Sequence, residues 1–163
     1  MTDTLELQHT YSESPERMRE VLTDPEYLRA KLREVGGQRA ELVSRDEDED
    51  GTVTVVQRQS VPADSLPSFA QSLVPGDVTI ERTETWTGPG GGPVNAVVVG
   101  TPAKISGTMT LRPHRDGVVF ALQIQAKVPI PLFSIAVEKM ITKNIADVME
   151  VEYRFTQDWL ARP

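Results

Sequence analysis

The chain has 163 residues and a net charge of −7, a length that suits one domain, which we place at residues 1–163. An acidic chain repels phosphate backbones, and the Lys and Arg residues are scattered, so we expect no nucleic-acid partner. With no cysteine and only two histidines, disulfides and thiolate nucleophiles are excluded, and we expect neither a metal ion nor a cofactor.

The hydropathy pattern bears on the compartment. The N-terminal residues have neither the basic nor the apolar segment of a secretion signal, and no window approaches about 20 consecutive apolar residues. We therefore expect a cytoplasmic protein without stable membrane insertion.

Residues 4–11 alternate strictly and predict a half-buried first strand, whose apolar face carries Leu5, Leu7, His9 and Tyr11. An N-capping residue followed by proline occurs at 14–15 and again at 24–25, which predicts two short helices in succession. A glycine pair at 36–37 ends the second helix.

From residue 38 the hydrophobic period changes to two. This pattern predicts strands at 38–45, 52–61, 77–87, 94–101, 104–113 and 118–128. The last strand is strongly β-branched, and its inward face is expected to carry Val118, Phe120, Leu122, Ile124, Ala126 and Val128.

Three connections between strands have distinctive compositions. The acidic run 46–51 predicts a solvated hairpin turn, because it lacks the downstream bidentate Glu of a calcium loop. The glycine run 88–93 predicts a flexible hairpin tip, since no Lys-Ser/Thr and no helix follow it. Segment 61–76 predicts a loop with a short helical turn, which could pack on the rim of the core or act as a lid.

Residues 132–160 follow Pro129 and Pro131 and predict one long amphipathic helix. An apolar arc of roughly 140° contains Phe133, Val137, Met140, Ile141, Ile145, Val148, Val151, Phe155 and Trp159. The opposite arc contains Lys139, Thr142, Lys143, Glu150, Arg154 and Gln157. Asn144 and Glu152 fall inside the apolar arc, so part of this face is expected to look into a polar or hydrated space.

This order of elements resembles the helix-grip fold of the START-like (SRPBCC) superfamily, which includes polyketide cyclases, Bet v 1 type plant ligand binders and lipid-transfer START domains. The sequence phrases at 101–113, 127–132, 137–139 and 155–160 resemble an uncharacterised bacterial family within it. The resemblance implies an α+β fold, in which a curved antiparallel sheet of about six to seven strands wraps around the C-terminal helix. It also implies a hydrophobic cavity between them, and it brings no established catalytic residues.

A few polar residues on inward faces would orient a ligand in such a cavity. The ligand-binding residues that we expect are His9, Tyr11, Gln57, Gln59, Arg82, Glu84, Trp86, Phe120, Leu122, Ile141, Asn144 and Val148. We assign no residue to catalysis.

Each polar candidate also has a purely structural interpretation. His9 could be an acid or base, or a buried histidine held by hydrogen bonds. Arg82 and Glu84 could clamp a carboxylate and position a proton donor, or form an ion-pair network. Trp86 could line the pocket or only fill the core. His114 precedes a tight turn, is expected to be exposed and receives no role.

Three functions follow from these alternatives. The first is a binder or carrier of a hydrophobic small molecule such as a lipid, isoprenoid or polyketide-like compound. The second is a cyclase or dehydratase that uses Arg82, Glu84 and His9. The third is a protein-interaction module with a collapsed cavity, which would bind an unspecified partner through a sheet edge or through residues 66–74.

Overall fold

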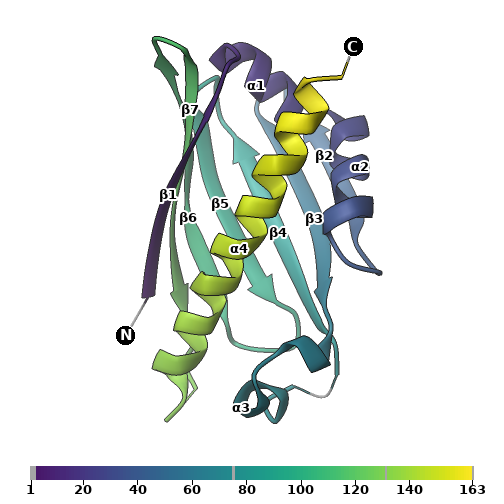
Figure 1. The fold of residues 1–163 in the computed structure, drawn as a ribbon, viewed down its shortest axis with the longest axis vertical. Helices are drawn as coiled ribbons and strands as arrows, with labels where there is room; N and C mark the ends of the chain where they lie inside the picture. The colour runs from purple at the N-terminus through teal and green to yellow at the C-terminus, as the bar shows by residue number, and fades with distance from the viewer. Residues whose placement is uncertain (1–2, 75, 131, 163) are drawn as a thin grey trace.

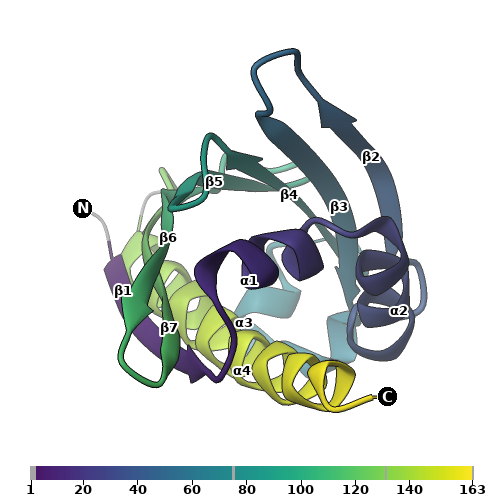
Figure 2. The same ribbon diagram turned by 90° about the horizontal axis from the view of Figure 1, so that it is seen from above.

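A computed structural model of the chain describes residues 3–74, 76–130 and 132–162. The chain forms a curved antiparallel sheet of seven strands in the order β1-β7-β6-β5-β4-β3-β2, and a long helix, α4, crosses its concave face (Figures 1 and 2). The predicted α+β helix-grip architecture is confirmed.

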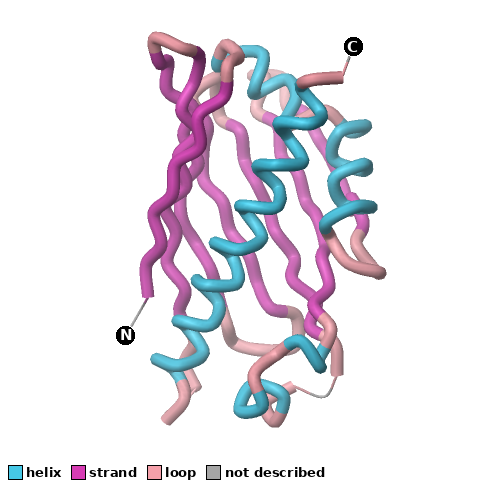
Figure 3. The backbone as a smooth tube through the Cα atoms, in the orientation of Figure 1, coloured by secondary structure: helices cyan, strands magenta, loops and turns pink. Residues whose placement is uncertain are grey.

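The elements seen in Figure 3 follow the predicted order along the chain. They are β1 (Asp3–Tyr11), α1 (Pro15–Leu22), α2 (Pro25–Val35), β2 (Glu41–Glu47), β3 (Val53–Val61), a 3-10 turn (Ala63–Ser65), α3 (Ser68–Gln71), β4 (Val78–Trp86), β5 (Gly91–Val98), β6 (Lys104–His114), β7 (Gly117–Lys127) and α4 (Ser134–Leu160).

The two short helices begin at the predicted caps. The Ser14 side chain accepts a hydrogen bond from the backbone N–H of Arg17 at 3.1 Å. The Asp24 side chain accepts one from the N–H of Glu26 at 3.2 Å. Each cap satisfies a backbone donor that the first helical turn leaves unpaired. Helices this short depend on tertiary packing, and their buried side chains join the core beneath the sheet.

Two strands are shifted from their predicted bounds: β2 covers 41–47 instead of 38–45, and β5 covers 91–98 instead of 94–101. β2 includes residues 46 and 47, so the acidic hairpin turn is shorter than expected. β5 begins at Gly91 rather than at residue 94, so half of the expected glycine-rich tip is strand. A Cβ atom at Gly91 would collide with the carbonyl oxygen of Met109, and one at Gly92 would collide with that of Thr85. Glycine is therefore required here for the close approach of neighbouring strands.

Helix α4 begins two residues later than predicted, because Leu132 has a φ of +72°. Pro131, which the sequence places before the helix, lies outside the described residues. The expected faces were also partly wrong: Phe133 and Val151 are 42% and 48% exposed, whereas Thr142 is buried and donates to the Asp3 carboxylate. The buried face includes Thr142, Glu152 and Thr156, which apolar periodicity does not count because these residues are polar.

The core lies between the concave face and the three main helices. The inward residues predicted for the last strand are buried from Val118 to Val128, although β7 itself ends at Lys127. Helix α2 packs beside β2 and α4 (Figure 2). His114 is exposed, as expected. Within the described ranges, no helix is both long and apolar enough to cross a membrane.

Candidate functional site

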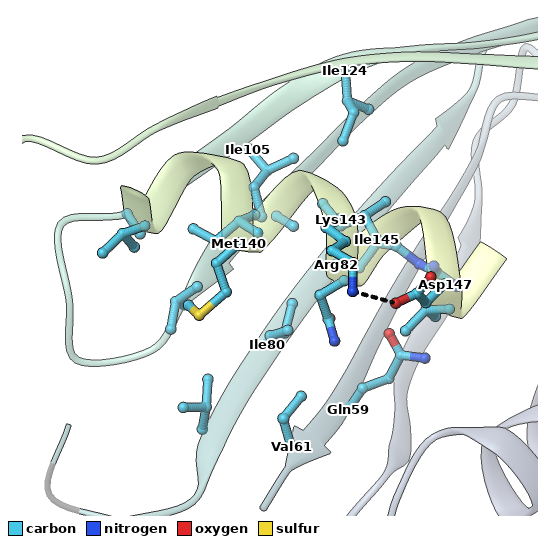
Figure 4. A pocket seen from close by; sticks show the side chains of 18 of the residues that line it. Gln59, Val61, Ile80, Arg82, Ile105, Ile124, Met140, Lys143, Ile145 and Asp147 are labelled. Atoms are coloured by element: carbon cyan, nitrogen blue, oxygen red, sulfur yellow. Dashed lines mark ion pairs between the residues drawn. The ribbon is translucent and has the colours of Figure 1, made fainter. Parts of the chain in front are cut away.

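A cavity of about 380 Å³ lies between the concave face of the sheet and the first half of α4. Figure 4 shows Val61 and Ile80 on the sheet side and Met140 and Ile145 on the helix side. The other aliphatic wall residues come mainly from β5, β6 and β7, from residues 66–74 and from α4. This volume is within the range of about 300–1,000 Å³ that is typical of small-molecule sites.

The diagonal path of α4 explains why a cavity forms here. The helix contacts β1, β7 and α2, so it bridges the two margins of the curved sheet (Figures 1 and 2). Among the described elements, the middle strands do not pack along α4, although α1 packs on β6 and Arg82 of β4 bonds to Glu152 in the second half of α4. The side chains of these strands, together with Ile141 and Val148 of α4, border the space instead.

Segment 62–76, of which the structure describes residues 62–74 and 76, lies at one end of the cavity. It contains the predicted helical turn, now resolved as a 3-10 turn and α3. Leu66 and Ala70 border the cavity, and Phe69 and Leu73 pack against a buried cluster of Ala103, Val128 and Val137. The segment thus packs on the rim of the core and also borders the cavity, and its action as a lid stays a prediction.

The inner end of the cavity is charged. We name Lys31, Arg82, Glu84 and Glu152 the inner charge cluster. The guanidinium of Arg82 donates from Nη1 and Nη2 to the two oxygens of Glu152, each at 3.2 Å. Lys31 Nζ is 3.3 Å from Glu152 Oε1, and Arg82 Nε is 3.4 Å from Glu84 Oε2. Two cations and two carboxylates thus balance one another with little solvent contact.

Two glutamines of β3 complete the surroundings of this cluster. Gln57 is fully buried, and its Oε1 accepts from Arg82 Nη2 at 3.5 Å. Gln59 donates from Nε2 to Glu152 Oε2 at 3.4 Å. Register places Gln57 directly opposite Arg82 on β4. Within the described residues, Gln57 Nε2 and Arg82 Nε have no hydrogen-bond acceptor.

The pKa values follow from these contacts. Burial would raise the pKa of Glu152, but the charges of Arg82 and Lys31 outweigh burial and lower it to about 2. Burial lowers the pKa of the Lys31 ammonium, and Glu152 partly offsets that effect. The adjacent carboxylates keep the pKa of Arg82 above its usual value despite burial. Arg82 and Glu152 are therefore held as an ion pair at neutral pH.

A second, much smaller space of about 30 Å³ lies behind this cluster, which is room for about one water molecule. His9, Tyr11 and Trp86 border it, and Glu84 borders both spaces. The indole Nε1 of Trp86 is buried and has no acceptor among the described residues.

His9 lies outside the main cavity. Its ring stacks on Tyr153 with centroids 4.2 Å apart, and its Nε2 is 3.8 Å from Glu150 Oε2. Burial lowers the pKa of His9, and Glu150 partly offsets this. The suggested catalytic group of Arg82, Glu84 and His9 therefore does not share one space. His9 is partly buried and is held by this ring stack, whereas the expected hydrogen bonds of its side chain are not found among the described residues.

The other expected site residues separate into groups. Eight border the main cavity, namely Gln59, Arg82, Glu84, Phe120, Leu122, Ile141, Asn144 and Val148. His9, Tyr11 and Trp86 border the small space only, and Gln57 borders neither. At the cavity margin, Lys143 and Asp147 of α4 are 4.0 Å apart and largely exposed (Figure 4).

Sequence reasoning missed Lys31, and it flagged Glu152 without finding its partners. Lys31 occupies the apolar face of α2 between Tyr27, Leu28 and Leu32. A lysine at such a position indicates a buried cation, which needs a carboxylate partner. Glu152 shows the same signal on α4, and pairing the two misplaced charges would have indicated their contact.

Comparison with known proteins gives the family and the fold. Residues 6–160 match the sequence pattern of a family described as "Protein of unknown function (DUF2505)". The chain is 29% identical to the uncharacterized proteins Rv0481c of Mycobacterium tuberculosis and Mb0491c of Mycobacterium bovis, over 98% of this chain and 98% of each relative.

Several solved structures share its architecture at low sequence identity. A protein from Rhodobacter sphaeroides has a TM-score of 0.61 at 18% identity, with 97% of this chain and 91% of that chain covered. TTHA0849 from Thermus thermophilus gives 0.59 at 17%, covering 95% and 96%. Ara h 8.0201 gives 0.53 at 12%, covering 94% and 98%. The chain therefore belongs to the DUF2505 family and has the helix-grip fold that these solved structures share.

Proposed function

We propose that the protein binds or carries a hydrophobic small molecule in the cavity between α4 and the sheet. The observation that carries this proposal is the cavity of about 380 Å³ with its predominantly aliphatic wall. Replacing water at an apolar wall by an apolar ligand lowers the free energy of the system, which favours binding. A few polar groups at one end of the cavity would orient the ligand. The START-like resemblance supports the same class, which includes lipids, isoprenoids and polyketide-like compounds.

Catalysis has weaker support from the contacts. Arg82 already holds Glu152 through two hydrogen bonds, and a substrate carboxylate would have to compete with that buried partner. His9 stacks on Tyr153, away from the main cavity. We therefore propose binding rather than turnover at this site. The collapsed cavity of the interaction-module alternative also does not match the open space.

The proposal can be tested with N-phenyl-1-naphthylamine, an uncharged apolar dye that fluoresces in dry environments. Ala96 faces the cavity from β5, so Ala96→Phe would occupy part of its volume. Val97, the next residue, is 41% exposed, so Val97→Phe adds the same ring to the outside of the same strand.

We expect the dye to bind the wild-type protein and Val97→Phe equally, and to bind Ala96→Phe at least about tenfold more weakly. Circular dichroism melts of both variants would show whether either has lost the fold. Equal dye affinity in Ala96→Phe and wild type would rule out this cavity as the binding site.

A further inference from the structure

The polar end of the cavity bears on the kind of ligand, and this inference rests on the proposed binding function. The buried charged groups at that end are Arg82 and Glu84, two residues apart on β4. Each has a side chain that is 12% exposed. Lys143 and Asp147 of α4 also border the cavity, but they are largely exposed and lie 4.0 Å from each other. Between the buried pair and segment 62–76 the wall is largely aliphatic, so a bound molecule would place its polar group at the β4 end.

Among the described residues that border this end, no buried cation is free to meet an anionic group. Arg82 directs two N–H groups to Glu152 and a third contact to Gln57. Lys31 is 3% exposed and lies 3.3 Å from the same Glu152 carboxylate. A ligand carboxylate or phosphate would have to separate these pairs and leave Glu152 buried without a partner, which is strongly unfavourable.

Glu84, in contrast to Arg82 and Lys31, has few partners. Within the described part of the chain it has one charged partner, Arg82 Nε at 3.4 Å through Oε2, and no side-chain hydrogen bond. Its carboxylate borders the cavity and also the small space behind it. A largely buried carboxylate is an acceptor that requires donors, and the neighbouring aliphatic side chains supply none.

A ligand hydroxyl would supply that donor without changing the charge of the site. A ligand ammonium would add a third cation beside Arg82 and Lys31, and would compete with Arg82 for Glu84. We infer that the cavity selects a neutral, largely aliphatic molecule with a terminal alcohol or phenol, whose O–H donates to the Glu84 carboxylate.

Displacement of N-phenyl-1-naphthylamine by four ligands of equal chain length tests this inference. These are 1-decanol, decyl methyl ether, decanoate and decylamine at pH 7. The ether keeps the oxygen but lacks the donor. In the wild-type protein we expect 1-decanol to displace the dye at concentrations at least about tenfold lower than any of the other three.

The Glu84→Met variant removes the acceptor while keeping similar bulk. We expect its alcohol-to-ether preference to fall to about one, and this ratio compares two ligands on the same protein. Glu81→Met is the matched control, because Glu81 lies on the outer face of β4 and pairs with Arg58 at 2.8 Å. It should keep the wild-type preference.

The outcomes separate the two proposals. Dye binding with decanoate or decylamine as good as or better than 1-decanol would overturn the alcohol inference and leave the binding function standing. An alcohol preference unchanged in Glu84→Met would also overturn it. Absence of dye binding to the wild type would overturn both proposals. The wild-type ligand series decides the matter even if Glu84→Met does not fold.

Discussion

Glu152 depends on two cations from different elements, Lys31 on α2 and Arg82 on β4. Glu152→Gln would remove its charge and leave both cations without that carboxylate. Breaking a buried pair in this way costs about 3–5 kcal/mol, of which amide hydrogen bonds recover a part. We expect a loss of about 3 kcal/mol in the free energy of unfolding, measured by urea denaturation.

Glu150→Gln is the control for this change, because Glu150 lies on the same helix and its side chain is 51% exposed. Its effect should stay within about 0.5 kcal/mol. Equal effects of the two substitutions would show that the Glu152 charge contributes nothing to stability.

The same carboxylate predicts a pH dependence. The pKa of Glu152 is about 2 in the folded protein and ordinarily 4.5. A group with a lowered folded pKa contributes stability that is complete above its unfolded pKa and is lost as the pH falls toward the folded value. The stability difference between wild type and Glu152→Gln should therefore shrink by roughly 2–3 kcal/mol between pH 6 and pH 2.

Urea midpoints of both proteins across this range would measure that difference, in which the other carboxylates cancel. A difference that stays constant down to pH 2 would mean that Glu152 is not the titrating group.

The sequence predicted the positions of Arg82 and Glu84 but not their contacts. Alternation placed Arg82 and Glu84 correctly on the inward face, because strand periodicity needs no tertiary information. Their partners lie far away in the chain, with Glu152 70 positions from Arg82. Periodicity cannot supply such a contact, so the network and its charge balance emerged only from the structure.

Helix α4 is anchored to the end of the sheet by Glu138. This side chain is buried, and its Oε2 accepts a hydrogen bond from the backbone N–H of Val128 at 2.8 Å. Glu138→Ala would leave that N–H unpaired, at a cost of about 1–3 kcal/mol. We expect the Val128 amide to lose its protection in hydrogen exchange followed by NMR.

Lys139→Ala is the matched control, because Lys139 is the next residue on the helix and is exposed. Protection of the Val128 amide that persists in Glu138→Ala would show that this bond does not hold the helix to the strand.

The packing of segment 62–76 at the end of the cavity is expected to control how fast a ligand is released. Phe69 and Leu73 hold the segment against the Ala103, Val128 and Val137 cluster at the end of the cavity. We expect the double substitution Phe69→Ser and Leu73→Ser to speed dye release several-fold in stopped-flow measurements, because a loosened cover opens more often. Substitution of the exposed Ser72 by Ala should leave the release rate unchanged. An unchanged rate in the double variant would assign the segment to rim packing alone.

The faces of α4 show the limit of prediction for an element. The apolar arc pointed correctly to Val137, Ile141 and Val148, which all border the cavity, and Val137 and Ile141 also pack in a buried cluster. The most buried positions include Glu138, Thr142 and Glu152, whose hydrogen bonds and ion pairs satisfy their polar groups. A hydropathy pattern assigns such a polar residue to the exposed face of the helix, because the pattern contains no information about its buried partner.

At the level of the whole molecule, the curved sheet wraps around one helix, which contacts β1 and β7 at one margin and α2 near the other (Figure 2). The cavity lies between this helix and the middle strands. The sequence predicted this arrangement well, because the order of elements and the β-branched last strand constrain the topology. It could not predict the size of the cavity, which depends on the path of α4 across the sheet and on the packing of segment 62–76.

The central claim is that this cavity holds a hydrophobic molecule. Native mass spectrometry of the wild-type protein, purified from its own host and compared with the denatured mass, tests it most directly. We expect a mass excess that matches a compound in an organic extract of the same sample, retained in Val97→Phe and lost in Ala96→Phe. An excess of the same size in Ala96→Phe, or none in the wild type across several growth conditions, would contradict the account.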